Sequence, residues 1–383
     1  MRGHARTSRG PVWLFVAALV VAVAAACSGG TDEAPYTLES ASGPGRFGVG
    51  VTTIELVDDT RPTEPNGDVP GRPERALTVE VWYPAPAGSP SPEARDAPLD
   101  RADGPYPLVL FAHGLSGVRR QSASFAQHLA SHGYVVASPD FPLSNLATPG
   151  GPRLAGVIEQ PKDLSFVADA LIARSSTAGD ALEGAVDPEA LAVSGHSLGG
   201  LTTLLTIYGP SRDARMKAAL ALSPPACFLT PDVVGEDATP LLVMGGSLDR
   251  IVDPASIRRG YDVARPPRYF VDLVGGNHIG FADLDIDEQV AAEALASGRV
   301  AGQIVDDAVA VAQAIGGSVT SCIDRTPPPA DPAMPGERQR ELLRTVGLAF
   351  LDAYVRGDEN ARRFLEHELP ALASDARFEY DAD

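Results

Sequence analysis

The motif that most constrains the fold is the sequence GHSLG at residues 195–199. A short apolar run at 191–193 precedes it and a helix-compatible run at 201–208 follows, so the pattern predicts a strand, a tight turn and a helix. Glycines two positions before and two after the serine let strand and helix backbones approach where side chains would clash. Ser197 at the apex would hold its hydroxyl above the sheet, where a substrate and a base can reach it. The alternative interpretation is a glycine-rich turn with a solvated serine.

The charge balance argues against a nucleic-acid partner. The 383 residues carry a formal net charge of −19, whereas a protein that binds phosphate backbones needs a basic surface. Hydrophobic residues make up 44% and charged residues 21% of the chain, which is ordinary for a globular protein with a buried core.

The first 26 residues predict a signal peptide rather than part of the fold. Three arginines in the first nine residues precede an apolar run at 12–26, which is shorter than the roughly 20 residues of a membrane-spanning helix. The run ends at Ala-Ala-Ala-Cys27 and resembles a bacterial lipoprotein signal peptide, in which the cysteine is lipidated. Residues 27–45 then form a flexible tether, and lipid on Cys27 would anchor the protein to a membrane. An ordinary secretory signal is the alternative, and either one exports the chain.

The two other cysteines, Cys227 and Cys322, are predicted to pair. An exported compartment permits disulfides, and two remaining cysteines are an even number. The bridge would close a loop of 95 residues (322 − 227) and stabilise the fold by about 4 kcal/mol in the chain-entropy estimate. Two buried free thiols are the alternative.

Strand-like and helix-like runs alternate along the chain. We expect strands at 79–83, 108–111, 134–137, 191–194, 218–222, 241–244 and 268–273, and helices at 122–132, 163–174, 201–208, 257–263 and 337–354. Strands separated by helices imply an α/β fold with a mostly parallel central sheet and helices on both faces.

The same pattern sets the expected domain organisation. One catalytic domain would occupy residues 46–370, and its more polar opening strands, 48–56 and 79–83, can pair as an antiparallel edge. Residues 285–330 interrupt the alternation and are interpreted as an insertion on the catalytic side. Residues 371–383 are expected to be a C-terminal tail.

A serine nucleophile needs a base, and the base needs an orienting acid. His278 fits the base because it follows the predicted strand 268–273 and two glycines free its backbone. The acid should follow the strand 241–244, where Asp249 comes first. Asp253 is the next alternative but fits better as the cap of a helix that begins at Pro254. The remaining candidates, for which we expect other roles, are His4, His113, His128, His132, His196, His367, Asp272 and Asp283.

The negative charge that develops on an attacked carbonyl oxygen needs two backbone N–H donors. The amide of Leu198 is supplied by the serine turn, and the amide of Leu115 is expected from the loop at 111–117. We expect His113 to brace that loop rather than to act chemically. The sequence has no cluster of histidine, cysteine and acidic residues at metal-ligand spacing, so no metal and no organic cofactor are expected.

Five segments carry a resemblance to a known family: 111–114, 129–136, 161–166, 195–200 and 276–278. They resemble the α/β-hydrolase superfamily, and more narrowly the bacterial dienelactone-hydrolase-like and platelet-activating-factor-acetylhydrolase-like group, with cutinase-type polyester hydrolases as cousins. The resemblance implies the α/β-hydrolase fold and the chain order Ser197, Asp249, His278. Dienelactone hydrolases use a cysteine where this chain has Ser197, which favours ester hydrolysis, and the acetylhydrolase resemblance implies short-acyl esters.

These patterns together predict an exported serine esterase that acts on small-molecule or lipid esters. Two alternatives remain open at this point. One is a different hydrolase with the same triad, such as a lipase, polyester hydrolase, peptidase or thioesterase. The other is a catalytically silent binding protein on the same fold.

Overall fold

The computed structural model describes residues 1, 3, 35–284, 286, 288–295, 298–322, 329 and 331–382. The chain divides into two units, Met1–Pro35 and Tyr36–Asp383. Cys27 and nearly all of the predicted signal peptide lie outside the described residues. Within the described part of the chain, no helix is long and apolar enough to cross a membrane.

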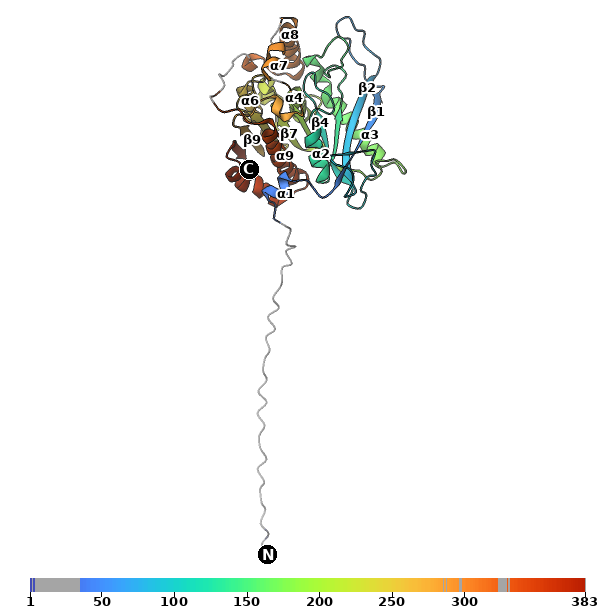
Figure 1. The fold of residues 1–383 in the computed structure, drawn as a ribbon, viewed down its shortest axis with the longest axis vertical. Coiled ribbons are helices and arrows are strands. Elements are labelled where there is room, and N and C mark those ends of the chain that lie inside the picture. The colour runs from blue at the N-terminus through green and yellow to red at the C-terminus, as the bar shows by residue number, and fades with distance from the viewer. Residues whose placement is uncertain are drawn as a thin grey trace. The chain divides into compact units, whose positions relative to one another are not determined.

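A ten-stranded sheet forms the centre of the second unit (Figure 1). Its strand order is β10-β9-β8-β7-β6-β4-β5-β2-β1-β3, and the central strands β9, β8, β7, β6, β4 and β5 run parallel to one another. Strand β1 pairs antiparallel with β2, as predicted, and so do β2 with β5 and β9 with β10. The strands are β1 Gly48–Asp58, β2 Arg75–Ala85, β3 Ala94–Arg95, β4 Tyr106–Ala112, β5 Val135–Pro139, β6 Val186–His196, β7 Met216–Leu222, β8 Leu241–Gly246, β9 Arg268–Leu273 and β10 Ala376–Asp381.

Helices cover both faces of this sheet because its strands are apolar on both sides. Along β4, Leu108 and Leu110 belong to one buried cluster and Val109 and Phe111 to the other. The first cluster includes side chains of α3, α4, α6 and α8, and the second includes side chains of α1, α2 and α9. The α-helices are α1 Leu38–Ser42, α2 Ala123–Ser131, α3 Gln160–Ser175, α4 Leu198–Tyr208, α5 Pro231–Val234, α6 Pro254–Val263, α7 Glu288–Leu295, α8 Gly298–Ile315, α9 Gly336–Val355, α10 Glu359–Arg363 and α11 Leu369–Leu372.

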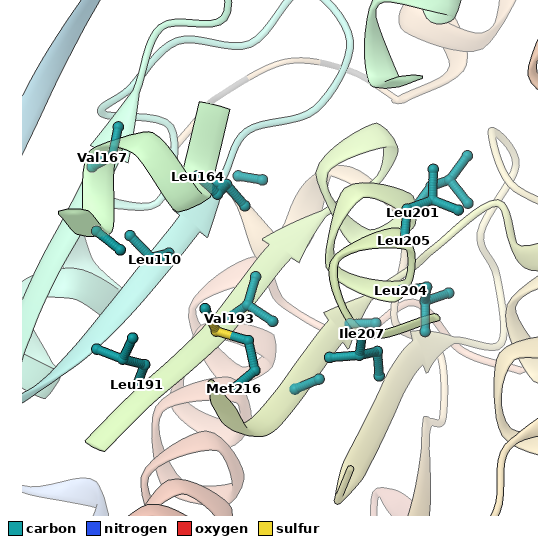
Figure 2. Packing of buried hydrophobic residues seen from close by; sticks show 14 of the residues in the cluster. Leu110, Leu164, Val167, Leu191, Val193, Leu201, Leu204, Leu205, Ile207 and Met216 are labelled. Carbon is teal, nitrogen blue, oxygen red and sulfur yellow. The ribbon is translucent and has the colours of Figure 1, made fainter. Parts of the chain in front are cut away.

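The packing is dense around β6 and α4, the two elements that flank the serine turn (Figure 2). Leu191 and Val193 of β6 and Leu201 and Leu204 of α4 are fully buried. Each such side chain contributes about 1.5–3 kcal/mol when it leaves water. The position of the turn is therefore set by two rigid, buried elements.

Two of the predicted boundaries are wrong. The expected tether at 27–45 contains α1, whose Ala41 is fully buried, and the hydroxyl of Tyr36 donates to Asp352 of α9 at 2.9 Å. The expected C-terminal tail contains β10, which pairs with β9. Both segments cover surfaces that would otherwise be left open: the apolar side of α9 and the unpaired edge of β9.

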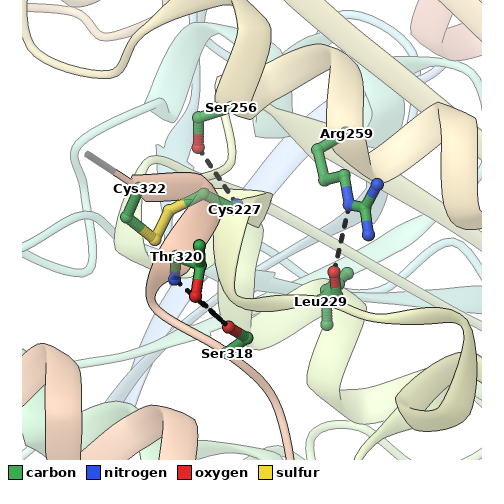
Figure 3. The surroundings of a disulfide bond; sticks show 7 residues. All are labelled: Cys227, Leu229, Ser256, Arg259, Ser318, Thr320 and Cys322. Carbon is green, nitrogen blue, oxygen red and sulfur yellow. Dashed lines mark hydrogen bonds between the residues drawn. A yellow bond between two sulfur atoms is a disulfide. The ribbon is translucent and has the colours of Figure 1, made fainter. Parts of the chain in front are cut away.

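The predicted insertion at 285–330 carries α7, α8 and the short turn η4 (Thr320–Cys322). An ion pair between Arg153 and Asp307 ties α8 to the body of the domain, and Val311 of α8 is fully buried. The predicted Cys227–Cys322 disulfide is present, with a Cα–Cα distance of 5.0 Å (Figure 3). The insertion is therefore a packed part of the domain.

Candidate active site

The serine turn has the strained geometry that its glycines predict. Ser197 lies between β6 and α4 with φ 59° and ψ −120°, a backbone conformation that side-chain-bearing residues rarely adopt. A Cβ on Gly195 would lie 2.3 Å from the carbonyl oxygen of Gly199, and a Cβ on Gly199 would lie 2.0 Å from that of Ala112. Neither glycine can be replaced without moving a backbone. The turn thus presents Ser197 at the carboxyl end of β6.

Asp249 and His278 meet at the carboxyl ends of the neighbouring strands β8 and β9. The Nδ1 atom of His278 lies 2.7 Å from the Oδ2 atom of Asp249, and both side chains are buried. The other carboxylate oxygen of Asp249 accepts the backbone N–H groups of Ile251 at 3.0 Å and Val252 at 2.8 Å. These contacts hold the carboxylate where it accepts a hydrogen bond from Nδ1 of His278. When the ring is neutral, its one proton is then on Nδ1, and Nε2 is unprotonated.

The alternative acids are engaged elsewhere. Asp253 caps α6 by accepting the N–H of Ala255 at 2.8 Å. Asp272 forms an ion pair with Arg377, and Asp283 accepts hydrogen bonds from Ser124.

The loop after β4 lies directly against the serine. A Cβ added to Gly114 would lie 3.1 Å from the Cβ of Ser197. The carbonyl oxygen of Gly114 accepts a hydrogen bond from His113 Nδ1 at 2.7 Å and another from the N–H of Gly117 at 2.9 Å. In a trans peptide the next N–H points away from that carbonyl, so these two bonds fix the direction of the Leu115 N–H.

His113 braces this loop. Its Nε2 atom accepts the N–H of Phe141 at 3.2 Å, so Nδ1 must carry the proton that it donates to Gly114. Burial lowers the pKa of His113, although its bond to Gly114 opposes that effect. His113 is therefore neutral at neutral pH, with both ring nitrogens occupied by structural hydrogen bonds.

A series of buried, hydrogen-bonded side chains that begins on α4 supports the same loop. The hydroxyl of Thr202 donates to the amide oxygen of Gln160, and the amide nitrogen of Gln160 donates to the hydroxyl of Ser144 at 2.7 Å. The backbone carbonyl of Ser144 accepts the N–H of Ser116 at 2.8 Å. The helix that begins at the serine and the loop that carries Leu115 are thus joined through a buried side-chain amide.

Sequence reasoning missed two residues that hold the His278 loop. The amide oxygen of Gln339 in α9 accepts the N–H of Asn277 at 3.0 Å, and its nitrogen donates to the Asn277 carbonyl at 2.7 Å. Glu288, in the first turn of α7, accepts the N–H of Arg250 at 2.7 Å and that of His278 at 3.2 Å. Burial and the nearby charge of Asp249 raise the pKa of Glu288. These contacts join residues distant in sequence and follow no local motif.

Comparisons with known proteins show which sequences and which fold this chain resembles. A family described as platelet-activating factor acetylhydrolase, isoform II, matches residues 85–142, which include β4 and the Leu115 loop. The platelet-activating factor acetylhydrolase of Cavia porcellus is 23% identical over 296 residues, which cover 67% of this chain and 59% of the relative. Cutinase 1 of Thermobifida cellulosilytica is 26% identical over 181 residues, which cover 46% of this chain and 62% of the relative. The chain thus spans about three fifths of the length of these curated relatives.

A solved structure decides the fold. The ferulic acid esterase from Streptomyces cinnamoneus matches with a TM-score of 0.61 and 22% sequence identity, over 88% of this chain and 98% of that chain. The chain has the α/β-hydrolase fold. The relatives found by sequence are named as an acetylhydrolase and a cutinase.

Proposed function

We propose that this α/β-hydrolase is an exported serine esterase with Ser197 as nucleophile, His278 as base and Asp249 as orienting acid. The observation that carries the proposal is the buried 2.7 Å contact between His278 Nδ1 and Asp249, which lies beyond the carboxyl ends of β8 and β9, at the same edge of the sheet as the strained Ser197 turn after β6. A strained serine alone could be structural. A strained serine at the same sheet edge as a histidine oriented by a carboxylate is the arrangement that a serine nucleophile needs.

The proposed reaction proceeds through an acyl-enzyme. His278 Nε2 takes the proton of Ser197 as its oxygen attacks the ester carbonyl, and the amides of Leu115 and Leu198 stabilise the oxyanion. The protonated His278 then gives its proton to the leaving alcohol. Water activated by His278 releases the acid and restores the serine.

The decisive test is Ser197→Ala. This variant should lose p-nitrophenyl acetate hydrolysis and labelling by a fluorophosphonate probe, because both need the hydroxyl. Ser194→Ala is the matched control: Ser194 is buried in the same strand, and its hydroxyl has no hydrogen-bond partner among the described residues. Full labelling of the Ser197→Ala variant would rule out this site.

Apolar side chains on the insertion favour esters with an apolar acyl or lipid part. Several exposed large hydrophobic residues of the described chain lie in or next to the insertion, namely Leu284, Ile286, Val290, Val305 and Val309. Exposed apolar groups mark a binding surface where they form one contiguous patch. Rates on p-nitrophenyl esters from acetate to palmitate, on phospholipids and on polyesters would assign the substrate. A matched amide and a matched thioester complete the panel, because a peptidase or a thioesterase would prefer them.

The proposed export rests on the sequence of residues 1–27. Lipidation at Cys27 predicts that the native chain sediments with membranes, and that Cys27→Ser releases it into the soluble exported fraction. Equal release of both forms would support the ordinary secretory signal instead.

A further inference from the structure

A buried row of polar side chains joins the loop that carries Leu115 to the loop that carries His278. The amide oxygen of Gln121 accepts the N–H of Gly114 at 3.0 Å, and its nitrogen lies 2.7 Å from Nδ1 of His196. The Nε2 atom of His196 lies 2.9 Å from the backbone carbonyl oxygen of His278. Gln121 and His196 are each less than 5% exposed. The row thus connects the loop that carries Leu115 to the loop that carries His278 without meeting solvent.

Each hydrogen bond in this row has a single consistent direction. A carbonyl only accepts, so Nε2 of His196 carries a proton and donates it to His278. In the neutral ring Nδ1 must then accept, and the NH₂ group of Gln121 is its donor. That leaves the amide oxygen of Gln121 to accept from Gly114. A glutamine and a neutral histidine can make all three hydrogen bonds in these directions. An ionised carboxylate at position 121 could not donate to Nδ1 of His196, because it carries no proton.

A second contact points to the same coupling. The backbone carbonyl of Gln121 accepts the N–H of Asp283 at 2.8 Å, and the hydroxyl of Ser122 donates to the carbonyl of Phe281 at 3.2 Å. The start of α2 is therefore bound to the segment that follows His278 through backbone as well as side chain. The ring of His196 also lies 4.6 Å, centroid to centroid, from the ring of His278.

We propose that Gln121 and His196 are positioning residues that hold two loops in one fixed relation. One is the loop at 111–117 that carries Leu115, the oxyanion loop, and the other is the loop that carries His278, the base loop. The proposal rests on the proposed serine esterase function. Neither residue touches the reacting atoms. Gln121 fixes the oxyanion loop at the backbone N–H of Gly114, and His196 fixes the backbone that carries the base. Breaking the row at either residue releases both loops, so the two residues act as a unit.

The neutrality of His196 is part of this role. Burial lowers the pKa of His196 well below its usual value, and the neighbouring His278 acts in the same direction. The reaction creates a positive charge on His278, and a neutral neighbour does not oppose it. The charged and titratable groups around His278 are then Asp249, in contact with its ring, and Glu288, in contact with its backbone N–H.

The test is a double-mutant cycle with Gln121→Met and His196→Phe, which keep length and shape but remove the polar atoms. A misplacement of about 1 Å costs on the order of 100-fold in rate, so each single variant should lose about 100-fold in kcat with little change in KM. The double variant should lose about the same, because the row is already broken. Gln127→Met is the matched control on α2, because the Gln127 amide donates to Glu93 outside the row, and its kcat should stay unchanged.

The pH profile separates positioning from general stability. Gln121→Glu keeps the acceptor for Gly114, and when the new carboxylate is ionised, its contact with His196 Nδ1 needs a proton on that nitrogen, which places a cation beside His278. The acid limb of the kcat/KM profile should move to lower pH in this variant, and its thermal unfolding reports whether it is folded. Two results together would overturn the inference: the kcat losses of the two single variants multiply in the double variant, and the acid limb of the Gln121→Glu profile stays at its original pH. Activity in Ser197→Ala would instead overturn the proposed function.

Discussion

Replacing Asp249 by asparagine should silence the enzyme while leaving its shape intact. The side chain has two different neighbours: one oxygen accepts two backbone N–H groups, and the other faces Nδ1 of His278. In the asparagine variant only the amide oxygen can accept, so it must stay on the backbone donors. The amide NH₂ group then faces His278.

That orientation reverses the proton arrangement of the base. A donor opposite Nδ1 forces this atom to accept, which moves the ring proton to Nε2, the atom that takes the proton of Ser197 in the proposed reaction. A base in the wrong tautomer lowers kcat by about 10⁴-fold in a triad of this kind. This corresponds to about 5.5 kcal/mol of lost transition-state stabilisation. Because two backbone donors fix the new amide, its rotation cannot restore the working tautomer.

The assay is kcat/KM for p-nitrophenyl acetate, together with the rate of fluorophosphonate labelling and thermal unfolding. Asp253→Asn is the matched control, since asparagine caps a helix about as well as aspartate and this variant should keep full activity. A loss of less than tenfold in Asp249→Asn would refute the assignment of the acid. Equal losses in the two variants would refute the argument from backbone donors.

Two further predictions concern stability. Replacing Cys227 and Cys322 together by alanine opens a 95-residue loop, which costs about 4 kcal/mol in the chain-entropy estimate and about 5 °C in Tm for a folded unit of this size. Scanning calorimetry checks this, and an unchanged Tm contradicts it. Burial raises the pKa of Glu80, but hydrogen bonds from Arg95 and neighbouring donors outweigh it and hold the pKa below the usual 4.5. Its stabilisation is therefore present above that value and lost as the pH falls through the lower folded-state pKa. Glu80→Gln should lower the unfolding free energy by about 1–3 kcal/mol at pH 7, and urea titrations should show the difference shrinking in acid; a pH-independent difference would contradict the linkage.

The sequence predicts the architecture well because the physics of its strands is local. Each strand of the parallel core is a short apolar run that needs cover on both faces, and helix-like runs separate these strands. The serine turn is equally local, because two glycines and a serine at fixed spacing permit one close crossing of strand and helix. The antiparallel pairing of β1 with β2 follows from their more polar, alternating pattern.

The parts that could not be predicted depend on distant partners. Residues 36–45 look like a tether, and nothing nearby shows that Tyr36 finds Asp352 more than 300 residues later. The same holds for β10, whose partner β9 lies more than 100 residues earlier. Around the candidate site, Gln121, Glu288 and Gln339 carry no motif. The role of each side chain becomes visible only when the fold brings the backbone N–H or carbonyl groups that it binds close to it.

The contacts of Glu288 have a consequence for exchanging the insertion between related enzymes. A lid that only covered a pocket could be cut out and replaced without loss of chemistry. Here the first turn of α7 supplies the acceptor for the N–H of His278, the proposed base, and for the N–H of Arg250, which follows the proposed acid. A grafted insertion must return a carboxylate to that point, so specificity can be redesigned most freely along α8, whose Val305 and Val309 are exposed.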